Sequence, residues 1–223
     1  GDPLPKYHPK ACNFTIDWLA ELSKLGNPIQ IMSRYEVEDK YLHNLSQLNR
    51  YNGHILYSTS ITSFNKYREI EPYSDSPERR LETVSRASQL GLATNVLVKP
   101  FISGITDLEA EDFITYFNKY DVKYCVVGKL MLDDENKKQL ERLGILNNIG
   151  DIPIAQTMDC NPSHNYGLAL DNKIETFEES LNGAGIKAFR KSSCVNSFIL
   201  SQPNPANYFH FDPNGYCINC GVC

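Results

Sequence analysis

The sequence predicts an α/β fold, a partial (β/α) barrel of parallel strands with outer helices, followed by an irregular cysteine-containing C-terminal appendage. Short apolar runs alternate with amphipathic helical patterns about five times, at a spacing of roughly 30 residues that is typical of βα units. The apolar runs lack a polar face, as parallel strands do when helices cover them. This alternation weakens near residue 159. We therefore predict a barrel over residues 1–159 and a loop-rich extension over residues 160–223. Because the core of this extension is small, we expect it to need a stabilising cross-link such as a bound metal.

Length and composition are those of an ordinary globular protein. The chain has 223 residues, of which 41% are hydrophobic and 22% are charged, and its formal net charge is −5. This charge disfavours a surface that coats nucleic acid, although it is compatible with a local basic groove. No run approaches the roughly 18 apolar residues that span a bilayer, so we expect no membrane partner. Seven cysteines, an odd number with three crowded at the C-terminus, do not fit a secreted disulfide framework and indicate a cytoplasmic location.

The first part of the chain is expected to contain two helices and two strands. Asn13 or Thr15 caps the first helix and Gly26 ends it, because side-chain oxygens favour the N-cap and glycine favours the position after a helix. Its predicted core-facing residues are Ile16, Leu19, Leu22 and Leu25. The elements that follow are a strand over residues 28–33, a helix over 38–48 and a strand over 54–61.

The helix over residues 76–90 carries the clearest signals in the chain. Ser76 is the N-cap, Pro77 occupies the first helical position, and Gly91 follows the last turn. The residues predicted to face the core are Leu81, Val84, Ala87 and Leu90. The basic residues expected on the solvated face, with partners such as Glu82, are Arg79, Arg80 and Arg86.

Further elements complete the predicted barrel. Thr106 and Glu109 have the spacing of a capping box, in which the two side chains close the start of a helix. A charged helix with few apolar residues is expected to lie outside. In chain order, the remaining elements are a strand over residues 94–101, the capped helix, a strand over 122–132, the charged helix over 133–143 and a strand over 152–158.

Polar residues follow or interrupt several predicted strands. Ser58 and Ser60 lie on the same face of one strand, because side chains alternate along a strand. Lys99 interrupts an apolar strand and must reach water, an anion or a carboxylate, since an unpaired buried charge is costly. Arg34 ends the strand over residues 28–33 in the same way. Because the carboxyl ends of parallel strands form one ligand crevice, the four residues together predict an anion-binding site. For Ser58 alone, a hydroxyl satisfied by neighbouring backbone is the preferred interpretation.

The C-terminal segment CINCGVC predicts a metal site. Cys217, Cys220 and Cys223 place three thiolates in one loop, a spacing that suits an iron–sulfur cluster. Zinc is the alternative, and an unliganded tail is a further one. Cys194 or Cys160 could supply a fourth ligand.

Four segments carry a resemblance to a known family. They are the serine-rich run from Ser58 to Thr62, Glu71-Pro72, the run from Ser76 to Leu81, and the run from Pro100 to Asp107. In this order they resemble the middle of the radical S-adenosylmethionine (SAM) enzymes, in the branch around spore photoproduct lyase. The resemblance covers roughly residues 1–130 and implies a partial barrel that binds SAM.

The resemblance also implies roles for individual residues. The opening GDPLP is similar to the Gly-Gly-Glu-Pro loop of the family, so Asp2 would receive the methionyl amine of SAM. Arg34 would meet the methionyl carboxylate, and Ser60 would contact the ribose or the methionyl part. Ile102 and Gly104 would lie against the adenine.

One part of the family pattern is missing from the sequence. The Cys-x-x-x-Cys-x-x-Cys loop that holds the catalytic 4Fe-4S cluster is absent, so we expect a fragment of a longer enzyme, with an auxiliary cluster at the terminal cysteines. The implied function is reductive cleavage of SAM to a 5'-deoxyadenosyl radical that abstracts hydrogen from a substrate. The expected partners are SAM, an electron donor such as a flavodoxin or ferredoxin, and a peptide, small metabolite or nucleic acid as substrate. The alternative is a non-catalytic ligand-binding, electron-transfer or structural module.

Overall fold

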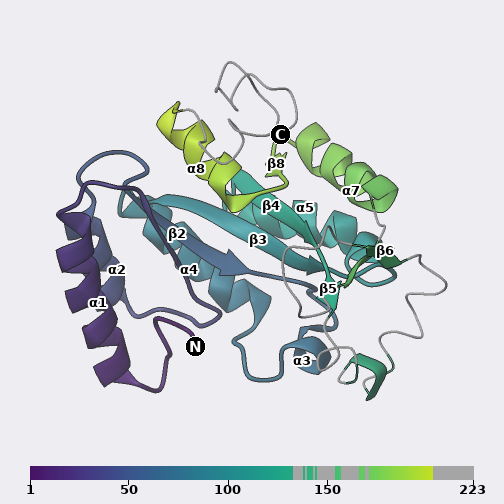
Figure 1. Cartoon of the computed structure of the whole chain (residues 1–223), viewed down its shortest axis with the longest axis horizontal. Helices are drawn as coiled ribbons and strands as arrows, with labels where there is room; N and C mark the ends of the chain where they lie inside the picture. The colour runs from purple at the N-terminus through teal and green to yellow at the C-terminus, as the bar shows by residue number, and fades with distance from the viewer. Residues whose placement is uncertain are drawn as a thin grey trace.

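The main feature of the fold is a five-stranded parallel sheet (Figure 1). The computed structural model describes residues 1–132, 138, 140–142, 144, 154–156, 166–168 and 171–202. The strand order is β1-β2-β3-β4-β8, and all four pairings are parallel. The bounds are β1 Ile29–Met32, β2 Ile55–Ser60, β3 Ala93–Phe101, β4 Tyr124–Lys129 and β8 Lys187–Phe189. The predicted α/β class with a parallel sheet is therefore confirmed.

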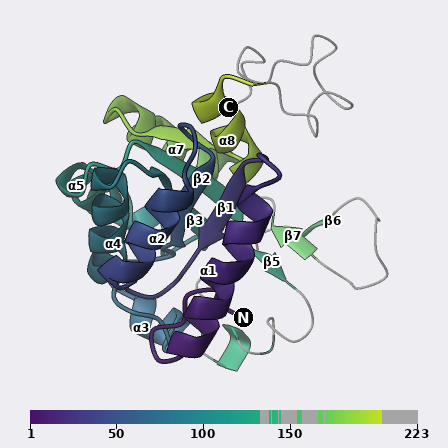
Figure 2. The ribbon, with the colours of Figure 1, turned by 90° about the vertical axis from the view of Figure 1, so that its left-hand side faces the viewer.

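Helices lie on both sides of this sheet (Figure 2). Their bounds are α1 Pro9–Ser23, α2 Asp39–Leu48, α3 Tyr67–Ile70, α4 Pro77–Gln89, the 3-10 turn η1 Asp107–Glu109, α5 Ala110–Lys119, α7 Asp171–Gly183 and α8 Ser192–Leu200. Helices α1, α2, α4, α5 and α7 pack on one face, which we call the outer face, and form the larger apolar core with it. Helix α8 packs on the opposite, inner face. None of the described helices is long and apolar enough to cross a membrane.

Side-chain alternation assigns the residues of each strand to one of these faces. In β2, Ile55 and Tyr57 belong to the outer core, whereas Leu56 belongs to the inner cluster. Ser58 and Ser60 follow Leu56 at intervals of two and therefore lie on the inner face. The inner cluster beneath α8 consists of Leu56, Leu97, Val126, Phe189, Cys194 and Val195. Helix α8 thus seals one part of the inner face with apolar side chains.

A second, small sheet is antiparallel and has the order β5-β7-β6. Its strands are β5 Met131–Leu132, β6 Ile154–Gln156 and β7 Tyr166–Leu168. The strand predicted over residues 152–158 is present as β6, but it does not continue the parallel sheet. Most of the charged helix predicted over residues 133–143 lies outside the described residues.

Helix α1 differs from its prediction in its start and in its buried face. It begins at Pro9 after His8, so Asn13 and Thr15 lie within the helix and do not cap it. The Thr15 hydroxyl donates instead to the carbonyl of Pro3 at 2.6 Å. Leu22 and Leu25 are 43% and 70% exposed, so their predicted core positions are wrong. This helix carries apolar residues on all its sides, and Phe14 and Trp18 are exposed as well. The spacing of its apolar residues therefore could not identify the side that faces the sheet.

The predicted capping box at the start of α5 is also wrong. The Thr106 hydroxyl donates to the carbonyl of Thr62 and accepts from the amide of Ile102. The Glu109 carboxylate accepts from the Ser63 hydroxyl and the Phe64 amide, both at 2.6 Å. Both side chains therefore fasten neighbouring loops to η1 and do not cap the helix.

Residues 171–200 continue the α/β alternation rather than forming a loop. Strand β8 pairs with β4, and Ile174, Phe177 and Leu181 of α7 belong to the outer core. Strand β8 was not predicted from the sequence, because a strand of three residues gives too short a signal. The remainder of the predicted extension, residues 203–223, lies outside the described residues.

Truncation of a core leucine in α7 tests whether this helix shares the core of the sheet. Leu181→Ala should lower the free energy of unfolding by about 2–5 kcal/mol, because Leu181 is wholly buried. Leu25→Ala, at an exposed position, is the matched control and should cost less than about 0.5 kcal/mol. Urea denaturation followed by circular dichroism measures both. Equal, small effects would contradict a shared core.

Candidate functional site

A groove of about 480 Å³ lies at the carboxyl end of β1. It is bounded by the N-terminal loop, the end of β1 and the loop between α3 and α4. The residues that line it are Gly1, Asp2, Pro3, Met32, Arg34, Tyr35, Ile70, Glu71, Pro72, Tyr73 and Ser74. Two of the predicted binding residues, Asp2 and Arg34, therefore lie in one groove. Both charge signs are present on its walls, so it suits a ligand that carries a positive and a negative group.

The Asp2 carboxylate fastens the N-terminal loop to the end of β1. Its Oδ1 accepts from the amide of Leu4 and from the hydroxyl of Ser33, each at 2.9 Å. Its Oδ2 accepts from the amide of Arg34 at 2.7 Å. A carboxylate has about four acceptor positions, so roughly one remains for a ligand.

Arg34 extends from the end of β1 and is connected to β2 through buried charges. Its Nε lies 3.6 Å from Oε1 of Glu71, and its side chain is 51% exposed. The other oxygen of Glu71 accepts from Nη1 of Arg80 at 3.0 Å. The same nitrogen donates to the carbonyl of Ser60 at the end of β2. The prediction that Arg80 lies on a solvated face is wrong, because this side chain is wholly buried.

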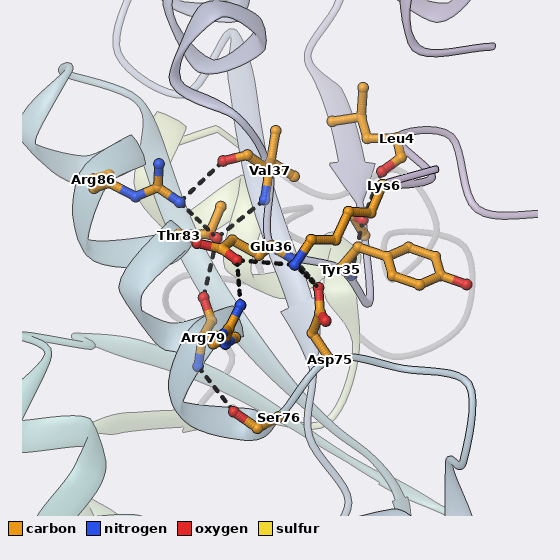
Figure 3. Close-up of polar contacts among 11 residues, drawn as sticks. Leu4, Lys6, Tyr35, Glu36, Val37, Asp75, Ser76, Arg79, Thr83 and Arg86 are labelled. Carbon is orange, nitrogen blue, oxygen red and sulfur yellow. Dashed lines mark hydrogen bonds and ion pairs between the residues drawn. The ribbon is translucent and has the colours of Figure 1, made fainter. Parts of the chain in front are cut away.

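A second set of charges holds the loop that follows Arg34 (Figure 3). Lys6 pairs with Glu36 at 3.1 Å and with Asp75 at 3.5 Å, and Arg79 of α4 also pairs with Glu36. The hydrogen bond from Lys6 lowers the pKa of Glu36, against the opposing effect of burial. The amide of Glu36 donates to Asp75 at 2.8 Å. Three segments far apart in the sequence are thus joined beside the groove.

The inner face of the sheet carries polar groups that the described residues do not satisfy. Ser60 is 2% exposed, and its hydroxyl has no partner within the described part of the chain. The same holds for both amide atoms of Asn95, which is wholly buried and pairs in register with Ser58. Ser58 itself accepts a hydrogen bond from Gln30 Nε2 at 2.8 Å. The Ser58 hydroxyl thus has a partner within the protein, but this partner is the Gln30 side chain and not the predicted neighbouring backbone.

Lys99 lies on the inner face next to Gly128 of β4. A Cβ at position 128 would lie 2.2 Å from Cε of Lys99, so glycine at this position leaves room for the lysine stem. Burial lowers the pKa of Lys99, and the nearby Cys194 opposes this shift. The ammonium group has no hydrogen bond or ion pair to the described residues. It is therefore able to receive an anion.

The turn after β3 holds the last two predicted residues. Ile102 is wholly buried in the outer core, and its amide donates to Thr106. Gly104 adopts a φ of 78°, and its amide donates to Asp107. Lys173 of α7 donates to Ser103 at 2.6 Å and to Asp107 at 2.9 Å, which fastens this turn to α7. Of the two residues, only Gly104 is partly exposed.

The structure therefore places the predicted residues in three neighbouring groups. Asp2 and Arg34 line the groove; Ser58, Ser60 and Lys99 lie on the inner face; and Ile102 and Gly104 belong to the turn after β3. The sequence analysis missed Glu71, Arg80 and Asn95 as parts of the site. Glu71 and Arg80 stand within segments that resemble the radical SAM family, which is the signal that could have identified them.

Metal ligands do not gather in the described part of the chain. No group of three or more histidine, cysteine, aspartate or glutamate side chains there could hold a metal ion. Cys12, Cys125 and Cys194 are buried and form no disulfide, and burial raises the pKa of the Cys125 thiol. Cys217, Cys220, Cys223 and the alternative ligand Cys160 lie outside the described residues. The described residues thus do not fit a 4Fe-4S cluster.

The fold and the site together define a parallel α/β partial barrel with a polar carboxyl edge. No family model and no curated protein matches the sequence. The structure is similar to solved structures of spore photoproduct lyase. A double mutant with bound AdoMet and dinucleoside spore photoproduct has a TM-score of 0.60 at 11% identity, over 84% of this chain and 57% of that chain. The complex with dinucleoside spore photoproduct has a TM-score of 0.54 at 13% identity, over 80% and 56%.

These similarities establish the fold. The predicted resemblance to spore photoproduct lyase is confirmed at the level of the fold, a parallel α/β partial barrel. This chain spans just over half the length of the lyase structures that it matches. At identities of 11–13%, the similarity does not transfer a substrate.

Replacement of the inner-face lysine should stabilise the protein. The folded state lowers the pKa of Lys99, so charging this lysine costs free energy at neutral pH that the unfolded chain does not incur. Lys99→Met should therefore raise the free energy of unfolding at pH 7. The gain should shrink as the pH approaches the ordinary lysine pKa of about 10.4. Denaturation curves at both pH values measure this, with Lys10→Met at an exposed position as control. A destabilised, pH-independent Lys99→Met protein would contradict the assignment.

Proposed function

We propose that this chain is the SAM-binding part of a radical SAM enzyme. The observation that carries the proposal is the half-exposed Arg34 guanidinium beside Asp2, in a groove at the carboxyl edge of a parallel sheet. Ligands bind at this edge in parallel α/β folds. One of the similar lyase structures contains AdoMet. SAM carries an amine and a carboxylate, which match the two charge signs of the groove.

Each residue has a distinct task in this proposal. Arg34 donates to the carboxylate of SAM through its guanidinium, and Asp2 accepts from the amine through its remaining acceptor position. Ser60 supplies a hydroxyl without a described partner toward the sugar or methionyl part. The Gly104 turn provides backbone at the adenine, while Ile102 supports this turn from the core. Ser58 is engaged with Gln30 and contributes to the wall of the site.

SAM and a 4Fe-4S cluster, when bound together, supply one-electron cleavage chemistry that ends in hydrogen abstraction from a substrate. The residues of this chain bind and orient SAM and exclude water from it. An electron donor of the flavodoxin or ferredoxin class belongs to the proposal, because this chemistry needs a reductant. We assign the reaction to the cytoplasm and no particular substrate to it.

Calorimetric titration of the purified chain with SAM tests the proposal. Arg34→Ala should weaken SAM binding by about tenfold or more, since a hydrogen bond to a charged group contributes about 1.5–3 kcal/mol. Arg50→Ala is the matched control, because Arg50 is an exposed arginine at the opposite edge of the sheet. The proposal fails if the chain does not bind SAM, or if both variants bind it as the wild type does.

We also propose Cys217, Cys220 and Cys223 as ligands of an auxiliary iron–sulfur cluster, with zinc as the alternative. Reconstitution with iron and sulfide should give a brown protein that absorbs at roughly 400 nm. Substitution of the three cysteines by serine should abolish this absorption and the bound iron. A colourless protein with stoichiometric zinc would favour zinc. Unchanged iron binding in the variant would contradict the assignment of these cysteines as cluster ligands.

A further inference from the structure

Arg34 is fixed by its neighbours at both ends of its backbone. Its amide donates to Asp2 at 2.7 Å, and its carbonyl accepts from the amide of Asp75 at 3.2 Å. Among the described residues, its side chain forms an ion pair with Glu71, with Nε 3.6 Å from Oε1. The backbone of Arg34 is therefore fixed, but it does not determine the direction of the guanidinium group.

We propose that Glu71 is the positioning residue that directs the Arg34 guanidinium into the groove. This inference rests on the proposed function of Arg34 and extends it. Glu71 lines the same groove, yet its side chain is only 6% exposed. The carboxylate of Glu71 is thus nearly buried, whereas the side chain of Arg34 is 51% exposed and open to a ligand.

The backbone of Glu71 is well fixed for this role. Its amide donates to the carbonyl of Tyr67 at 2.6 Å, and its carbonyl accepts from the amide of Ser74 at 3.0 Å and the hydroxyl of Ser74 at 2.8 Å. Its Oε2 is held by the wholly buried Arg80 at 3.0 Å. A carboxylate fixed at its backbone and at one oxygen can hold the second oxygen in place.

The geometry leaves the useful donors of Arg34 for a ligand. Glu71 faces Nε, so the two terminal nitrogens, Nη1 and Nη2, are left to form a pair of parallel hydrogen bonds with a carboxylate. One carboxylate serves two guanidinium groups here, those of Arg34 and Arg80. Glu71 therefore does not neutralise Arg34 fully, and the groove retains attraction for an anionic group.

A double-mutant cycle distinguishes positioning from a purely structural role. The proteins are the wild type, Arg34→Ala, Glu71→Gln and the double variant, and the ligands are SAM and 5'-methylthioadenosine, which lacks the methionyl carboxylate. Glu71→Gln should weaken SAM binding about three- to tenfold and change 5'-methylthioadenosine binding less than about twofold. In the Arg34→Ala background, Glu71→Gln should not weaken SAM binding further. Equal weakening in both backgrounds, or for both ligands, would overturn the inference.

A readout without ligand separates this inference from the proposed function. Relaxation of the Arg34 Nε–Hε group by NMR should indicate a restrained side chain in the wild type and a mobile one in Glu71→Gln, with Arg50 as internal control. If the wild type does not bind SAM, the proposed function fails, while the NMR result still decides the positioning. Equal Arg34 mobility in the two proteins would refute the positioning role even if SAM binds.

A second variant covers the case in which Glu71→Gln does not fold. Glu71→Asp keeps a negative charge near the buried Arg80, and its side chain is one methylene shorter, which lengthens the distance to Arg34 beyond 3.6 Å. It should give the same pattern of SAM weakening and Arg34 mobility. Wild-type SAM affinity and wild-type Arg34 order in a folded Glu71→Asp protein would count against the inference.

Discussion

The carboxyl edge of the sheet depends on one buried ion pair, between Arg80 of α4 and Glu71 of the preceding loop. Arg80 is wholly buried, and its Nη1 donates to Glu71 and to the carbonyl of Ser60. Loss of one partner of such a pair typically costs about 3–5 kcal/mol, because the other charge then stays buried and uncompensated. If the loop between β2 and α4 moved away from α4, the Arg80 charge would stay buried without its partner Glu71. Glu71 is held in this way next to Arg34, and the groove at β1 acquires a fixed wall.

The loops at this edge are fastened by charged and hydroxyl side chains rather than by apolar packing. Glu109 holds the loop after β2, Thr106 joins that loop to the turn after β3, and Lys173 with Asp107 joins the turn to α7. Loops have many backbone amides and carbonyls that need partners, and these side chains supply them. Their fixed geometry lowers the ordering cost that a ligand would otherwise meet on binding. A rigid edge of this kind agrees with a site that orients its ligand.

The sequence predicted strands β1 to β4 and helices α2 and α4 well, because these depend on local periodicity. Strand β3 and helix α4 lie where the apolar runs and the Ser76-Pro77 start place them. Polar residues at the carboxyl ends of parallel strands were predictable for the same reason. Side-chain partners that are distant in sequence could not be predicted. Thr106 and Glu109 have the spacing of a helix cap, yet the same oxygens serve loops more than 40 residues away. A local pattern could not indicate that Arg80 is buried, because its position depends on Glu71 and on the end of β2.

The inner face adds a constraint on what the site can bind. Helix α8 seals part of it with an apolar cluster, whereas Ser60, Asn95 and Lys99 keep polar groups there without described partners. Each unsatisfied buried polar group costs roughly 1–3 kcal/mol, so a ligand or water with complementary groups recovers free energy that the free protein lacks. This face therefore favours a polar ligand over an apolar one. Ser60 joins the two surfaces, since Arg80 holds its carbonyl beside the groove and its side chain lies on the inner face. A ligand that extends from the Arg34 groove toward Lys99 would meet the Ser60 hydroxyl on its way.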